Sequence, residues 1–156
     1  EGAEALLGLG NIARRRKRTQ EALAFYRRLV KEFPRGGARM ERALVWVGKL
    51  EARAGRHAEA MEAYGQVAGA TTSVTRMAKV YDLMIKVKLA QGDLAGAKAV
   101  LAEGRQALAR LKEISARKAK AVTKALDRMK GPARIAKAEA GAQEPDEKEK
   151  GKHGEE

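Results

Sequence analysis

The chain has 156 residues and no cysteine, and it contains only two histidines, three prolines and one tryptophan. Without cysteine it has no disulfide framework, no thiolate nucleophile and no cysteine metal site. His57 and His153 are far apart in the sequence, and Glu59 follows His57 too closely to share its face of a helix, so no metal-binding pair is indicated. No run of about 18 apolar residues occurs, and therefore no membrane span is predicted.

The sequence also lacks the motifs of common catalytic sites. The patterns GxSxG, GxGxxG and HExxH and the P-loop do not occur. Seven acidic residues lie within residues 131–156, but that segment is predicted below to be disordered, and flexible backbone does not hold catalytic geometry. We therefore expect a protein that is not an enzyme and that uses no cofactor.

The charge of the chain is strongly positive. Lys and Arg number 33 against 20 acidic residues, which gives a formal net charge of +13. Residues 105–130 alone carry nine basic and two acidic residues. A field of this sign attracts acidic proteins and nucleic acids alike. Proteins that bind single-stranded nucleic acids stack the bases on aromatic side chains. This chain has only one Trp, three Tyr and two Phe, which leaves few aromatic side chains for that role. An acidic protein partner is therefore preferred, and nucleic acid is the second choice.

Apolar and small residues recur at helical spacing in three successive hairpins. The first copy contains Leu6, Leu9, Gly10, Ala13, Ala22, Phe25, Tyr26 and Leu29; the second contains Leu44, Val47, Gly48, Ala60, Tyr64 and Val67; the third, looser copy contains Tyr81, Met84, Ile85, Ala97 and Leu101. Ala22, Ala60 and Ala97 are 38 and 37 residues apart. Repetition with such a period predicts a solenoid.

The spacing resembles the tetratricopeptide repeat, whose pattern is W-x2-L-G-x2-Y, then A-x3-F, then P. The first copy reads Leu6-x2-Leu9-Gly10-x2-Ala13, then Ala22-x3-Tyr26, then Pro34. The second reads Leu44-x2-Val47-Gly48, then Ala60-x3-Tyr64, and has Glu51 where an aromatic residue is usual. The third reads Tyr81-x2-Met84-Ile85, then Ala97-x3-Leu101. The resemblance implies an all-α fold, a right-handed superhelix of helical hairpins with repeats at about residues 3–37, 41–72 and 78–110. Gly10 and Gly48 are expected to let the paired helices approach closely.

Five consecutive basic residues, RRRKR, occupy positions 14–18. Arg14, Arg15 and Arg16 are expected in the last turn of a first helix, where cations complement the helix dipole. Lys17 takes the turn position that Gly55 and Gly92 hold in the other copies. We interpret the run chiefly as a helix end, with contact to an acidic partner and a nuclear or nucleic-acid signal as alternatives.

Beyond the third copy, the sequence predicts a cap and a tail. An amphipathic stripe over residues 107–130 predicts a basic helix that covers the last exposed core of the solenoid. Docking of this helix on RNA or on an anionic membrane is the alternative interpretation. After Gly131 and Pro132, the composition turns to Ala, Glu, Lys and Gly with a single Ile, so residues 131–156 are predicted to be a disordered, charged tail. The predicted folded domain therefore comprises residues 1–130.

In the family that the repeats resemble, peptides lie in a concave groove lined by the first helix of each repeat. The resemblance places these residues in such a groove: Asn11, Arg15, Arg42, Trp46, Lys49, Arg53, Lys79, Asp82 and Lys86. Arg42 and Lys49 are seven residues apart and share a helix face, as do Lys79 and Lys86. We expect a basic groove with Trp46 as an apolar anchor; solvated lysines around a core tryptophan are the alternative.

The predicted function is a scaffold that binds an acidic peptide or partner helix, within a larger tetratricopeptide-repeat protein. Nucleic-acid binding and self-association through an uncapped N-terminal edge remain alternatives. The compartment is left open, with the cytoplasm as the default. The segment RRLVKEFP is similar to accessory proteins of the Tol-Pal type, and the bacterial periplasm or envelope would apply if an upstream signal segment had been removed.

Overall fold

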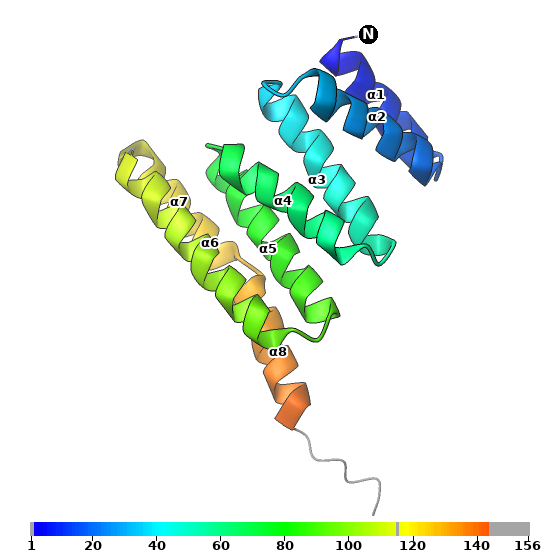
Figure 1. Ribbon diagram of the computed structural model, residues 1–156. Coiled ribbons are helices and arrows are strands. Elements are labelled where there is room, and N and C mark those ends of the chain that lie inside the picture. The colour runs from blue at the N-terminus through cyan, green and yellow to red at the C-terminus, as the bar shows by residue number, and fades with distance from the viewer. Residues whose placement is uncertain (1, 115, 144–156) are drawn as a thin grey trace, which may run out of the picture.

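The computed structural model describes residues 2–114 and 116–143. The helices in these ranges are α1 (Ala3–Arg15), α2 (Thr19–Glu32), α3 (Gly37–Arg53), α4 (His57–Ala70), α5 (Val74–Ala90), α6 (Leu94–Ile114), α7 (Ala116–Arg128) and α8 (Gly131–Gln143). Consecutive helices from α1 to α7 pack against each other, with α1 at one end of the array and α6 to α8 at the other (Figure 1). The chain is an all-α helical-repeat solenoid, as the sequence predicted. None of the helices in the described ranges is long and apolar enough to cross a membrane.

The turns within the hairpins lie where the sequence placed them. Lys17, Gly55 and Gly92 follow the first helix of their hairpins and have φ angles of 60°, 75° and 72°. This left-handed conformation suits glycine and strains a residue with a Cβ, so the first hairpin carries a local strain that the other two avoid. Asp93 caps α6, because its Oδ1 accepts a hydrogen bond of 2.7 Å from the N–H of Gly96.

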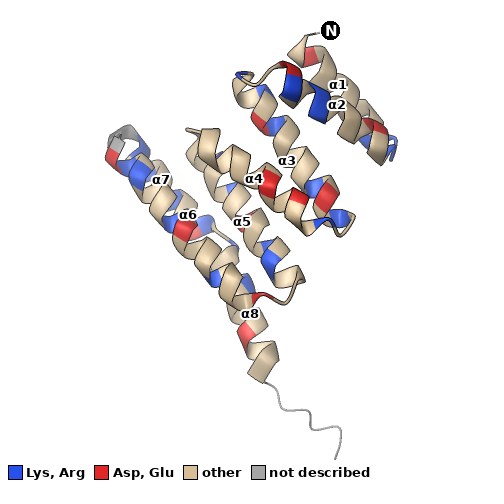
Figure 2. Cartoon of the chain, viewed as in Figure 1, with Lys and Arg blue, Asp and Glu red and all other residues tan. Residues whose placement is uncertain are grey.

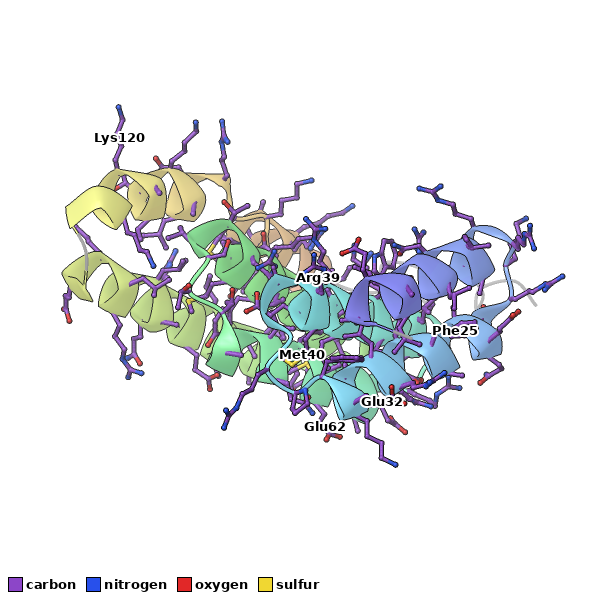
Figure 3. All side chains as sticks on the ribbon, turned by 90° about the horizontal axis from the view of Figure 1, so that it is seen from above. Phe25, Glu32, Arg39, Met40, Glu62 and Lys120 are labelled. Carbon is purple, nitrogen blue, oxygen red and sulfur yellow. The ribbon has the colours of Figure 1, made fainter. Side chains whose placement is uncertain are left out.

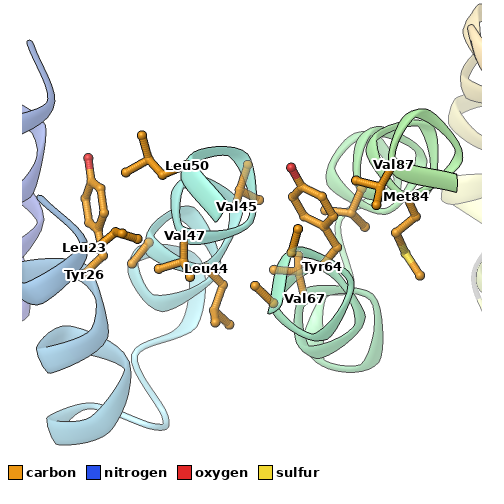
Figure 4. Close-up of a cluster of buried hydrophobic side chains, with 14 of the residues drawn as sticks. Leu23, Tyr26, Leu44, Val45, Val47, Leu50, Tyr64, Val67, Met84 and Val87 are labelled. Carbon is orange, nitrogen blue, oxygen red and sulfur yellow. The ribbon is translucent and has the colours of Figure 1, made fainter. Parts of the chain in front are cut away.

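Each hairpin is held by a tyrosine that packs on a glycine of the partner helix. A Cβ added to Gly48 of α3 would lie 2.7 Å from Cδ1 and 2.8 Å from Cζ of Tyr64 in α4, and Gly10 stands in the same relation to Tyr26. Both rings are almost fully buried (Figure 4). The third hairpin reverses the pair, since Tyr81 comes from the first helix and lies over Gly104 of the second. This reversal explains why the third copy has no glycine at the position of Ile85.

Glu51 shows why the second copy departs from the repeat pattern. Its side chain is fully buried in α3 and accepts hydrogen bonds from Arg27 of α2 and Arg56 of the following turn. A buried carboxylate requires such partners, because an unpaired charge in the interior is costly. The acidic residue therefore joins two hairpins at a position where the family pattern has an aromatic ring.

The structure corrects the predicted cap and tail. The apolar stripe over 107–130 is not one helix, because α6 continues to Ile114 and α7 packs back on α6 and α5. Residues 131–143 are not disordered but form α8, which packs on α5 and α6. Three contacts hold α8 in place. Ile135 is buried, and Asp82 caps the start of the helix. Gly131 packs so closely on Ile85 that an added Cβ would collide with it. The rest of the predicted tail, 144–156, lies outside the described residues.

Candidate functional site

A cavity of about 270 Å³ lies where side chains of α3 and α5 face each other. Its lining consists of Arg42, Val45, Trp46, Lys49, Ser73, Thr75, Arg76 and Lys79. The structure thus brings together four of the groove residues predicted from the sequence, namely Arg42, Trp46, Lys49 and Lys79. Three of these residues come from one helix: Arg42, Trp46 and Lys49 lie on one face of α3 at helical spacing.

Two cations approach the indole ring of Trp46, which is partly buried. The guanidinium carbon of Arg14 lies 3.7 Å from the ring centroid, and Nζ of Lys49 lies 4.5 Å from it. Both distances are in the range of cation–π interactions. Arg14 comes from α1, so the RRRKR run is more than a helix end: its first residue packs against the groove of the next hairpin.

The positive charges near Trp46 act on one another. Burial, followed by the charges of Lys79, Arg53 and Arg14, lowers the pKa of Lys49. Crowding of like charges disfavours the protonated form of a lysine, as does loss of hydration. This part of the molecule therefore holds a positive potential that a carboxylate would relieve.

Among the cations that line this cavity, Arg76 pairs with Glu41. In the part of the chain that the structure describes, no ion pair is formed by the residues that we call the basic groove: Arg14, Arg42, Lys49, Arg53 and Lys79, together with Trp46. Ion pairs do form in other parts of the described chain, for example between Glu51 and Arg27. Figure 2 shows basic residues along α5 and α7 and acidic residues on α4.

The other predicted groove residues have different surroundings. Asn11 accepts a 2.8 Å hydrogen bond from the hydroxyl of Tyr26, which couples it to the hairpin contact. Asp82 accepts hydrogen bonds from the backbone N–H groups of Lys130 and Gly131 at 3.0 and 2.8 Å and so belongs to the start of α8. Arg15 and Lys86 are exposed and do not line the cavity.

A second cavity, of about 490 Å³, lies between α5, α7 and α8 and shares Thr75 and Lys79 with the first. Sequence reasoning missed the basic residues that line it, which are Lys124, Arg128, Lys130 and Arg134. The four-residue spacing of Lys124 and Arg128 was a signal that they share a helix face, but a capping role explained that face equally well. No group of His, Cys, Asp and Glu within residues 2–114 and 116–143 is arranged to hold a metal ion.

Comparison with known protein families gives a match for the first hairpin. A family model described as "Tetratricopeptide repeat" matches residues 4–35, which cover nearly all of α1, all of α2 and the turns that follow them. No curated protein matches the chain. The resemblance seen in residues 3–34 is therefore confirmed. The second hairpin repeats its tyrosine-on-glycine packing, and the third has the same contact with the two helices exchanged.

Proposed function

We propose that this chain, in which α1 and α2 form a tetratricopeptide repeat, is a non-catalytic scaffold that binds an acidic peptide or partner helix in its basic groove. The repeat suggests a protein–protein interaction scaffold, and the residues of the groove suggest the chemistry of the partner. The observation that carries the proposal is the cluster of Arg14, Lys49 and the other cations of the basic groove around Trp46, which have no acidic partner within residues 2–114 and 116–143.

Charge supplies the attraction in this proposal. Carboxylates of a partner would reduce the repulsion that Lys79, Arg53 and Arg14 exert on Lys49. The exposed charges of the groove, Arg42 and Lys79, act mostly on the rate of association, because they steer the partner over distances comparable to the Debye length. An acidic segment should therefore bind quickly at low salt and more slowly as salt is added.

Trp46 supplies the anchor. Its ring is only partly buried, and it lines the cavity beside Val45, so an apolar atom of the partner can contact it while neighbouring carboxylates reach Arg14 or Lys49. Tryptophan and arginine are the residues most enriched among interface hot spots. The groove thus combines an apolar contact with cations in fixed positions around it.

The test uses the fluorescence of Trp46, which is the only tryptophan of the chain and therefore reports on the groove directly. The probe is a fluorescein-labelled peptide of alternating Glu and Ala blocks, compared with a peptide in which each Glu is replaced by Gln. We expect the acidic peptide to bind and to change the tryptophan emission. The double change Lys49→Glu and Lys79→Glu should abolish this binding, whereas Lys112→Glu with Lys120→Glu, an equal change of charge outside both cavities, should preserve it.

Arg14 and Arg16 offer a second matched pair. Arg14 contacts Trp46, whereas Arg16 is exposed at the end of α1. Arg14→Ser should weaken binding of the acidic peptide, and Arg16→Ser should leave it unchanged. Equal effects of the two changes would mean that only the total charge matters. Tighter binding of single-stranded RNA than of the acidic peptide, with an orders-of-magnitude loss between about 50 and 200 mM salt, would assign the cations to phosphates instead.

A further inference from the structure

The proposed function uses the basic groove and leaves the cavity between α5, α7 and α8 unexplained. It is the larger of the two cavities that contain Lys79, at about 490 Å³ against about 270 Å³. Ligand-binding cavities commonly have volumes of roughly 300–1,000 Å³. Its lining comes from α5, from α7, which packs back on α5, from the residues between α7 and α8, and from Arg134 of α8.

The lining of this cavity divides into an apolar part and a cationic part. The apolar part consists of Ala78, Leu83, Ala121, Ala125 and Met129, and the cationic part consists of Lys79, Lys124, Arg128, Lys130 and Arg134. None of the five cations forms an ion pair within the described ranges. The single carboxylate among the lining residues, Asp82, is already engaged by the backbone N–H groups at the start of α8.

We infer that this cavity receives the aliphatic side chains of an acidic amphipathic helix, the same partner segment that occupies the basic groove. The inference rests on the proposed function and names the partner more closely. Thr75 and Lys79 line both cavities, so one segment can pass from the basic groove to the second cavity without leaving α5. Carboxylates on one face of the helix meet Lys124 and Arg128, while its apolar face covers Ala121 and Met129.

The chemistry of the lining favours an aliphatic occupant over a nucleic acid. The residues that line the second cavity include no aromatic side chain on which a base could stack. Its apolar lining, which includes Leu83 and Ala125, is aliphatic or thioether in character. A helix that lays its apolar side chains into a groove is a common mode of peptide recognition. Charge complementarity then orients the helix, since both cavities repel a basic segment.

The experiment compares two fluorescein-labelled helical peptides of 20 residues with the same glutamates. One carries Leu at positions i, i+3, i+4 and i+7 of each repeat, and the other carries Ala at these positions. We expect the leucine peptide to bind the full chain about tenfold more tightly, as measured by fluorescence anisotropy. Equal affinities for the two peptides would overturn the inference.

Four variants locate the effect. Ala121→Glu places an acid in the cavity from an exposed position of α7, and Lys124→Glu reverses a charge of its lining. Their matched controls are Thr123→Glu and Lys120→Glu, which make the same changes on α7 outside the lining; Figure 3 shows Lys120 standing out from the helix. Ala121→Glu and Lys124→Glu should remove the preference for leucine, and the controls should keep it.

The outcomes separate this inference from the proposed function. If both peptides bind equally, and Lys49→Glu weakens both, the basic groove is used and the second cavity is not. If neither peptide binds, or if binding ignores Lys49 and the emission of Trp46, the proposed function fails and the inference falls with it. Equal losses for Ala121→Glu and Thr123→Glu would refute the cavity as the site. Thermal melting by circular dichroism shows for each variant whether the fold is retained.

Discussion

Gly48→Ala tests the contact that holds the second hairpin together. The added methyl group would lie 2.7 Å from Cδ1 and 2.8 Å from Cζ of Tyr64, well inside van der Waals contact. The ring of Tyr64 is 1% exposed and packs in the core, so it has no free space into which it can move. Overpacking of this kind costs about 1–3 kcal/mol, and the close approach of several ring atoms argues for the upper end.

Helix propensity opposes this cost. Replacing glycine by alanine inside a helix stabilises it by about 1 kcal/mol, so the net loss for Gly48→Ala should be about 2 kcal/mol. In a chain of this size, that loss corresponds to a melting temperature lower by about 4–8 °C. Gly65 is the matched control, because it lies in α4 with no atom within 4 Å of an added Cβ. Gly65→Ala should raise the melting temperature.

The assay is thermal and urea unfolding followed by circular dichroism. A double-mutant cycle isolates the contact: with Tyr64→Ala in place, Gly48→Ala should no longer destabilise the chain, because the atoms that it would meet are gone. The reasoning is wrong if Gly48→Ala and Gly65→Ala stabilise the chain equally. It is also wrong if the loss caused by Gly48→Ala persists when Tyr64 is truncated.

Four further predictions follow from the geometry. Lys17→Gly should stabilise the chain by about 1 kcal/mol, whereas Gly55→Ala should destabilise it, because both residues have positive φ; urea unfolding midpoints measure both effects. Glu51→Gln should cost about 2 kcal/mol in the same assay, since it weakens two charge-assisted hydrogen bonds of a buried carboxylate. Burial raises the pKa of Tyr64 from 10.0 to about 12, so the unfolded chain loses this proton at a lower pH than the folded chain does. The free energy of unfolding should therefore fall as the pH rises through that window, by up to about 1.4 kcal/mol per pH unit. Denaturation midpoints, measured together with tyrosinate absorbance, would show no such fall if the ring were open to water. Trp46→Ala should speed dissociation of the acidic peptide and cost about 2 kcal/mol of binding free energy, and an unchanged dissociation rate would remove the ring from the site.

The sequence by itself determined the features that depend on residues close in the chain. Gly48 was expected at a close approach of two paired helices, because helical periodicity sets the face of each residue, and the structure identifies Tyr64 as the side chain packed on it. The turn at Lys17 was predicted by alignment with Gly55. Arg42, Trp46 and Lys49 were placed together by the register of the repeat that the chain resembles, and they lie within two turns of one helix.

The tertiary structure decided what depends on contacts between distant segments. The approach of Arg14 to Trp46 is set by the packing of one hairpin on the next, and the capping of α8 by Asp82 joins residues 49 positions apart in sequence. Composition alone suggested that residues 131–143 contain too little apolar surface to be ordered. The order of α8 comes instead from a surface on α5 and α6 that receives Ile135 and Gly131, and a surface built by other helices leaves no trace in the local pattern of a segment.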